Sequence, residues 1–201
     1  MNEQTRELHV VIGAGPLGLS VVNAAVEKGY RVRLVHRSGL AAVPSSVECV
    51  AADVTDSAGL IRAVHGAACI YQCASPPYHQ WPQLFPSLQR NILSAARTIN
   101  ARVVIGENLY MYGDTKGEPM TERTPWAATT RKGSIRARMA EEALYEHRSG
   151  RMQVAIARGA DFFGPGVLQS ILGDRAIGAA VRGARASLIG DMDMPHSFTY
   201  I

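Results

Sequence analysis

Three glycines near the start of the chain have the spacing of a phosphate-binding turn. Gly13, Gly15 and Gly18 form a Gly-x-Gly-x-x-Gly motif between a short β-branched run and a stretch with helical periodicity. In such a unit the first glycine permits a tight turn, the second lets backbone N–H groups approach a pyrophosphate, and the third lets helix and strand pack closely. The motif predicts a dinucleotide-binding site, with Pro16 and Leu17 in the first helical turn.

The end of the next expected strand distinguishes between the two nicotinamide dinucleotides. An NAD site usually has Asp or Glu about 20 residues after the glycines, where it holds the ribose 2′-hydroxyl. This chain has His36, Arg37 and Ser38 there. A guanidinium forms a charge-assisted contact with a 2′-phosphate, and a serine hydroxyl adds a hydrogen bond, so the sequence favours NADP over NAD. The alternative is that Arg37 is a solvated loop charge.

Strand and helix patterns alternate along most of the chain, which indicates a parallel sheet with helices on both faces. The expected fold is α/β, a Rossmann-type doubly wound parallel sheet followed by the start of a small C-terminal substrate-binding portion. We expect the Rossmann domain over 1–163 and the substrate-binding portion over 164–201. Strands are expected at 8–12, 31–35, 47–51, 67–72, 102–105, 153–157 and 197–201, and helices at 19–26, 57–64, 84–100 and 135–148.

Composition and charge exclude several classes of protein. The 201 residues are 47% hydrophobic and 19% charged, no apolar run is long enough to cross a bilayer, and residues 1–7 do not form a secretory signal. We therefore expect a cytoplasmic protein without a membrane partner. The net charge of +4 is spread along the chain and is not interleaved with aromatic residues, so no nucleic-acid partner is expected. Cys49, Cys69 and Cys73 lack metal-ligand spacing, and no metal site is expected.

Several short segments together resemble the extended short-chain dehydrogenase/reductase superfamily, in its NAD(P)-dependent epimerase/dehydratase branch. The resemblance covers essentially the whole chain, although Ile12 stands where the first glycine of the family's turn normally falls. It implies that the chain binds NAD(P). The segments are 11–18, Asp53-Val54, Cys73-Ala74-Ser75-Pro76-Pro77, Tyr110-Met111-Tyr112-Gly113 and 158–166.

The resemblance also implies which residues surround the cofactor. Asp53 and Val54 are similar to the pair that receives the adenine in this family. Cys73, Ala74 and Ser75 look like the small residues that lie along the cofactor after the fourth strand. These five residues complete the expected cofactor site.

On the substrate side, the resemblance implies contacts from Tyr112, Asp161, Phe163 and His196. Nucleotide-sugar members of the family tend to have an arginine where this chain has His196, and an asparagine where it has Asp161. A neutral histidine holds a diphosphate poorly and a carboxylate repels phosphates. We therefore expect the substrate not to be a nucleotide sugar.

The family's catalytic residues are a Ser or Thr, a Tyr, and a Lys four residues after the Tyr, and this chain departs from that pattern. The Ser/Thr position falls on Asn108, and the helix with Tyr and Lys falls on 131–138. Two registers are open, and neither supplies both side chains. They place Gly133 and Ala137, or Ser134 and Arg138, at the two positions.

Substitutes for these residues are Asn108, Arg136 and Arg138. An amide can donate a hydrogen bond to a substrate carbonyl, and a guanidinium can stabilise an oxyanion or hold phosphate or ribose oxygens. Against this, each arginine fits an ordinary solvated helix face. Tyr110 and Tyr112 are alternative proton donors, although a tyrosine before glycine in this motif more often serves packing.

Two functions from different classes follow. The first is an NADP-dependent oxidoreductase or epimerase-like enzyme that acts on a small carbonyl or hydroxyl compound and lacks the usual Tyr-x-x-x-Lys pair. The alternative is a non-catalytic NADP-binding redox sensor or regulator. A homodimer is left open. Because the strand at 197–201 reaches the terminus without a cap, we expect the chain to be the nucleotide-binding part of a longer protein.

Overall fold

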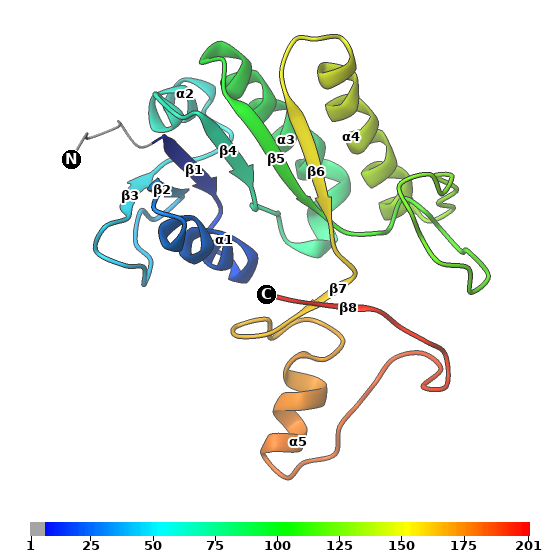
Figure 1. Ribbon diagram of the computed structural model, residues 1–201. Helices are drawn as coiled ribbons and strands as arrows, with labels where there is room; N and C mark the ends of the chain where they lie inside the picture. The colour runs from blue at the N-terminus through cyan, green and yellow to red at the C-terminus, as the bar shows by residue number, and fades with distance from the viewer. Residues whose placement is uncertain (1–6) are drawn as a thin grey trace.

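The computed structural model describes residues 7–201, and its centre is a six-stranded parallel sheet (Figure 1). The strands lie in the order β3-β2-β1-β4-β5-β6. Strands are added outward from β1 to one edge and then from β4 to the other edge, so the switch point of the strand order lies between β1 and β4. A crevice for ligands forms at such a switch point in doubly wound sheets. The predicted Rossmann-type fold is confirmed. The strands are β1 (Leu8–Ile12), β2 (Arg31–His36), β3 (Glu48–Ala51), β4 (Cys69–Gln72), β5 (Arg102–Glu107) and β6 (Val154–Arg158).

Helices cover both faces of this sheet, and the central strand β1 serves both cores. Val10 and Ile12 pack in the core beneath α2, α3 and α4, whereas Val11, between them, packs in the core beneath α1. Successive side chains of a strand point to opposite faces, so β1 is buried on both sides and reads as a continuous apolar run. The helices are α1 (Pro16–Glu27), α2 (Ser57–Val64), α3 (Trp81–Thr98) and α4 (Arg131–Arg148).

Helix α4 begins at Arg131, four residues before the expected start at Ile135. The side chain of Thr130 caps it, because its Oγ1 accepts a hydrogen bond from the backbone N–H of Gly133 at 3.1 Å. The longer helix places Lys132 and Arg136 one turn apart on the same side.

After β6 the chain enters a smaller portion, which Figure 1 shows beyond the ends of the sheet strands. Here β7 (Asp161–Phe163) pairs in parallel with β8 (Phe198–Tyr200). A π-helical turn, η2 (Gly173–Gly178), leads into the short helix α5 (Ala179–Val181) between them. The β7–β8 pairing joins residues on both sides of the division expected at residue 163, and that division stays a prediction.

The cap of α4 is testable by a single substitution. Thr130→Ala removes the oxygen that accepts from Gly133, and we expect the free energy of unfolding to fall by about 1 kcal/mol. Thr129→Ala is the matched control, because Thr129 is exposed; its effect should stay below about 0.5 kcal/mol. Urea denaturation of both variants measures the difference, and equal effects would show that Thr130 does not cap the helix.

Candidate functional site

The three glycines of the turn between β1 and α1 meet different steric requirements. Gly13 has a φ of +110°, and a Cβ there would lie 2.6 Å from the backbone nitrogen of Ala74. A Cβ on Gly18 would collide with the carbonyl oxygen of Gly13. Gly15 has an extended backbone, and no atom lies within 4 Å of the place where its Cβ would be. The fold therefore requires Gly13 and Gly18, whereas Gly15 borders open space.

This open space lies at the N-terminus of α1, where unpaired N–H groups and the helix dipole favour an anion. Gly15 is the N-cap and supplies no side-chain acceptor, Pro16 begins the helix, and the first turn has no acidic residue. The side chain of Leu17 points away from the turn and packs against Gly106 of β5. The N-terminus of α1 is thus open in front of Gly15, as the predicted pyrophosphate site requires, and the Leu17 side chain packs within the protein.

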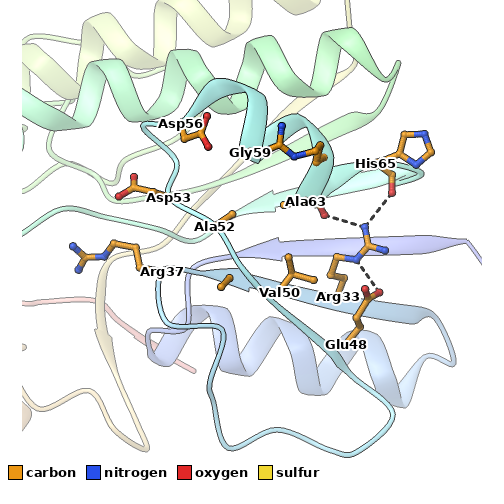
Figure 2. Close-up of a pocket in the computed structure, with 12 residues that line it drawn as sticks. Arg33, Arg37, Glu48, Val50, Ala52, Asp53, Asp56, Gly59, Ala63 and His65 are labelled. Atoms are coloured by element: carbon orange, nitrogen blue, oxygen red, sulfur yellow. Dashed lines mark hydrogen bonds and ion pairs between the residues drawn. The ribbon is translucent and has the colours of Figure 1, made fainter.

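A cavity of about 620 Å³ runs between the edge strand β3 and helix α2, and Figure 2 shows Arg37 and Asp53 at one end of it. Thr55 donates two hydrogen bonds to Asp53 Oδ1, from its backbone nitrogen at 2.8 Å and its hydroxyl at 2.7 Å. These bonds lower the pKa of Asp53, and the charge of Arg37 acts in the same direction. Arg37 has no ion-pair partner in the described part of the chain, whereas Arg33 is paired with Glu48. A free guanidinium therefore stands where the sequence predicts the 2′-phosphate.

The other residues expected near the ribose and adenine already have partners within the protein. The Ser38 hydroxyl lies 3.3 Å from His36 Nδ1 and also contacts the backbone of Leu40, so it is engaged in its own loop. Val54 packs against the core, and its carbonyl oxygen accepts a hydrogen bond from Asn91 Nδ2 at 2.9 Å. A 2′-phosphate would have to compete for the Ser38 hydroxyl, so Arg37 is the stronger of the two expected contacts.

The segment after β4 lies directly beside the glycine turn. The backbone nitrogen of Cys73 donates to Ile12 at 2.9 Å, and the backbone of Ala74 is the close neighbour of Gly13. Burial raises the pKa of the Cys73 thiol to about 12, so it is not a reactive thiolate. The Ser75 hydroxyl donates to the carbonyl oxygen of Pro76. The segment has the placement expected of a wall of the cofactor site.

A buried glutamate that the sequence analysis did not single out connects three elements beneath the site. Glu107, at the end of β5, forms an ion pair with Arg136 of α4 at 3.0 Å and accepts a hydrogen bond from Arg158 of β6 at 2.9 Å. Arg158 donates in turn to the Tyr112 hydroxyl at 2.9 Å. Arg136 is 1% exposed and Tyr112 is 3% exposed. The burial of Arg136 shows that the alternative of a solvated helix face is wrong, whereas contacts of Arg136 and Tyr112 with substrate stay predictions.

Burial dominates the electrostatics of this network. It raises the pKa of Glu107 and lowers the pKa of Arg136, and in each case it outweighs the attraction between the two groups. The Nε and Nη1 atoms of Arg136 are also buried without a hydrogen-bond partner in the described structure. Removal of the Glu107 charge would leave Arg136 buried and uncompensated, which makes the pair costly to break.

The remaining catalytic candidates, Asn108 and Arg138, differ in their surroundings. Asn108 accepts a hydrogen bond from the backbone nitrogen of Tyr110 through Oδ1 at 3.2 Å, which leaves its NH2 group to donate. Arg138 is exposed, because residues two apart on a helix point in nearly opposite directions and Arg136 points inward. Catalytic roles for Asn108 and Arg138 both stay predictions.

Sequence reasoning also missed Lys132 and Tyr78. The Nζ atom of Lys132 lies 3.2 Å from the centre of the Tyr78 ring, and the hydroxyls of Tyr78 and Tyr110 are 3.5 Å apart. Lys132 and Arg136 have the four-residue spacing of Tyr-x-x-x-Lys, so they occupy a third register that the two considered above do not include. That spacing was the available signal.

The other substrate-side residues gather in the smaller portion. His196 Nε2 lies 2.7 Å from Asp161 Oδ2, and Phe163 packs edge-on against Phe198 and Tyr200. Burial chiefly raises the pKa of Tyr110, with further contributions from Tyr78 and the charge of Asp161. The portion after β6 therefore comes close to the loop that follows β5. Among residues 7–201 no helix has the length and hydropathy to cross a membrane, and no three His, Cys, Asp or Glu side chains are grouped as a metal site.

Comparison with known proteins identifies the family. The model of the NAD-dependent epimerase/dehydratase family matches residues 9–201, so the chain belongs to this family and the predicted resemblance is confirmed. Comparison of the sequence with curated proteins gives no significant match.

Solved structures with the same fold include three sugar-nucleotide enzymes. A UDP-galactose 4-epimerase has 22% identity and a TM-score of 0.73, with 88% of this chain and 63% of that chain covered. A UDP-N-acetylglucosamine 4-epimerase from Methanobrevibacter ruminantium M1 has 16% identity and a TM-score of 0.81, with 97% and 69% covered. A dTDP-glucose 4,6-dehydratase from Bacillus anthracis str. Ames, in complex with NAD, has 16% identity and a TM-score of 0.82, with 96% and 67% covered.

These likenesses establish the fold. The chain spans 63% of the length of the first of these enzymes and 67–69% of the other two. Because all three are named for nucleotide-sugar reactions, the comparisons give no support to the exclusion of a nucleotide-sugar substrate. The NAD in the dehydratase structure likewise gives no support to a preference for NADP.

The buried ion pair provides a prediction of stability. Glu107→Gln leaves Arg136 charged and buried, and we expect the free energy of unfolding to fall by about 3–5 kcal/mol. Adding Arg136→Met to Glu107→Gln should recover part of that loss, because the uncompensated charge is then gone. Glu141→Gln, which breaks the exposed Glu141–Arg148 pair, is the control and should cost below about 1 kcal/mol. Urea denaturation measures all three, and equal losses for Glu107→Gln and Glu141→Gln would contradict the account.

Proposed function

We propose that the protein is an NAD(P)-dependent oxidoreductase or epimerase-like enzyme for a small carbonyl or hydroxyl compound, with NADP as its preferred cofactor. The observation that carries this proposal is the open space in front of Gly15, at the N-terminus of α1 and at the switch point of the sheet. The residues present fit the group: the turn leaves room for a pyrophosphate, and Arg37 is free to meet a 2′-phosphate. When bound, the nicotinamide dinucleotide supplies a hydride donor or acceptor.

The chain's own residues bind the cofactor and orient the substrate. The backbone N–H groups at the start of α1 hold phosphate oxygens, and the wall formed by Cys73, Ala74 and Ser75 limits the cofactor on the side of β4. Asn108 donates from its NH2 group to a substrate oxygen, while its Oδ1 stays with Tyr110. This orientation stabilises negative charge on that oxygen as it develops.

A second candidate function is a non-catalytic NADP-binding redox sensor or regulator. The observation that favours it is the burial of Arg136, which the ion pair with Glu107 holds away from any bound ribose. In the family the basic residue of the Tyr-x-x-x-Lys pair contacts the nicotinamide ribose and activates the tyrosine. A protein without that contact could bind cofactor and turn over nothing.

One assay separates these functions. The full chain is incubated with NADPH and with NADH against a panel of aldehydes, ketones and quinones, while the nicotinamide absorbance is followed. It is also incubated with NADP+ and with NAD+ against UDP-glucose, and the products are separated by chromatography, because epimerisation or dehydration leaves no net change in the nicotinamide absorbance. Cofactor-dependent turnover of a small carbonyl compound supports the enzyme, and turnover of UDP-glucose alone would move the substrate class to nucleotide sugars. Cofactor binding without turnover supports the sensor, and absence of binding would overturn both.

The preference for NADP is tested at Arg37. Calorimetric titration should show that Arg37→Ala weakens NADP binding by about 1.5–3 kcal/mol, because one charge-assisted contact is lost, and changes NAD binding little. Arg31→Ala, at the other end of β2, is the matched control and should leave both affinities unchanged. Equal affinity of the unsubstituted protein for NADP and NAD would contradict the assignment.

The pyrophosphate site is tested at Gly15. Gly15→Val should abolish cofactor binding and leave the protein folded, because its side chain enters space that no protein atom occupies. Gly18→Ala offers the contrast, since its Cβ collides with Gly13 and should lower stability. Circular dichroism and titration of the same samples separate the two effects; retained binding by Gly15→Val would show that the turn is only structural.

A further inference from the structure

Three aromatic side chains and one lysine gather near the ends of the sheet strands, and we refer to them as the aromatic–lysine cluster. Tyr78 lies in the short helix η1 (Tyr78–Gln80), Trp81 begins α3, Tyr110 follows β5, and Lys132 is in the first turn of α4. The ring centres are 5.0 Å apart for Tyr78 and Trp81, 5.9 Å for Trp81 and Tyr110, and 6.5 Å for Tyr78 and Tyr110. Four segments of the chain thus form one compact group.

The cluster is more open than packing requires. Tyr78 is 54% exposed and Tyr110 is 38% exposed, whereas Met111 and Tyr112, the next two residues of the same loop, are buried. Met111 and Tyr112 therefore pack this loop against the rest of the protein, and Tyr110 is not needed for that packing. A group of exposed aromatic side chains in contact with one another is typical of a binding surface.

The cluster adjoins the proposed cofactor site. Trp81 Nε1 donates to the carbonyl oxygen of Pro76 at 3.1 Å, and Pro76 directly follows the wall residue Ser75. On the other side, the backbone nitrogen of Tyr110 is hydrogen-bonded to Asn108, the candidate oxyanion donor. A molecule on the cluster would therefore reach both Asn108 and the end of the cofactor wall.

Lys132 supplies a charge that the protein does not neutralise. It has no carboxylate partner in the described residues, and its Nζ atom lies over the Tyr78 ring. By contrast Arg136, one turn further along α4, is paired with Glu107. The nearby carboxylate of Asp161 is engaged by His196. An ammonium group held on an aromatic face stays available to an anion.

We propose that the aromatic–lysine cluster is a subsite for an aromatic carboxylate, which packs its ring against Tyr78 and Trp81 and pairs its carboxylate with Lys132. The Tyr78 hydroxyl donates to that of Tyr110 at 3.5 Å, which leaves the Tyr110 hydroxyl to donate to the ligand. Because burial raises the pKa of Tyr110, this hydroxyl keeps its proton at neutral pH and donates. The proposal deepens the proposed function, on which it rests, by naming the class of substrate that the site accepts.

The test uses the full chain without cofactor and three probes: cinnamate, its neutral analogue cinnamamide, and the anion cyclohexanecarboxylate, which has no aromatic ring. The chain has two tryptophans, so in a Trp126→Phe background the fluorescence reports on Trp81 alone. Cinnamate should quench this fluorescence, and each of the other probes should bind roughly tenfold or more weakly. Lys132→Met should reduce cinnamate affinity by a similar factor and leave cinnamamide unaffected. Lys116→Met, in an exposed loop, is the matched control and should change nothing.

Circular dichroism of each variant confirms that it is folded. Equal binding of cinnamate and cinnamamide, or unchanged cinnamate affinity in Lys132→Met, would overturn the proposal, as would an absence of quenching in the folded protein. NADP titration of the same samples separates this result from the proposed function. If cinnamate does not bind as expected and NADP binding is intact, only the subsite is rejected. If cinnamate binds and NADP does not, the proposed function is rejected.

Discussion

The close approach of the glycine turn to the segment after β4 governs the geometry of the site. Gly13 takes a positive φ against the backbone of Ala74, and Gly18 lets α1 approach the carbonyl oxygen of Gly13. A side chain at either position would push α1 away from the sheet. With both contacts made, the N-terminus of α1 is held beside the switch point between β1 and β4, and the space in front of Gly15 stays open.

The ion-pair network beneath the site has a comparable effect on α4. Glu107 holds Arg136 and Arg158 together, so it links β5, β6 and α4 in the core. Because Arg136 is directed inward, the rotation of α4 about its axis is determined. Lys132, one turn earlier on the same side, then lies over Tyr78. A buried charge pair thereby positions the half-buried Lys132 at the proposed substrate site, and the two features belong to one arrangement.

Much of the fold could be predicted because its signals are local. Alternating apolar strands and helical periods predicted the parallel sheet, and the glycine spacing predicted the turn. The start of α4 was placed too late because its signal is a cap by Thr130, outside the apolar pattern. The partners of Glu107 lie 29 and 51 residues further along the chain, at positions 136 and 158, so no short motif joins them. The burial of Tyr112 and Arg136 could not be predicted, because burial depends on packing that residue type does not reveal.

The central claim is that the space in front of Gly15 receives the pyrophosphate of a nicotinamide dinucleotide. Amide hydrogen exchange of the full chain, measured with and without NADPH, tests it most directly because it locates the contact along the backbone. The account predicts slower exchange at residues 15–19 and 73–75 and little change at the other end of the sheet, around residues 8 and 102. Unchanged exchange at residues 15–19 under saturating NADPH would contradict it.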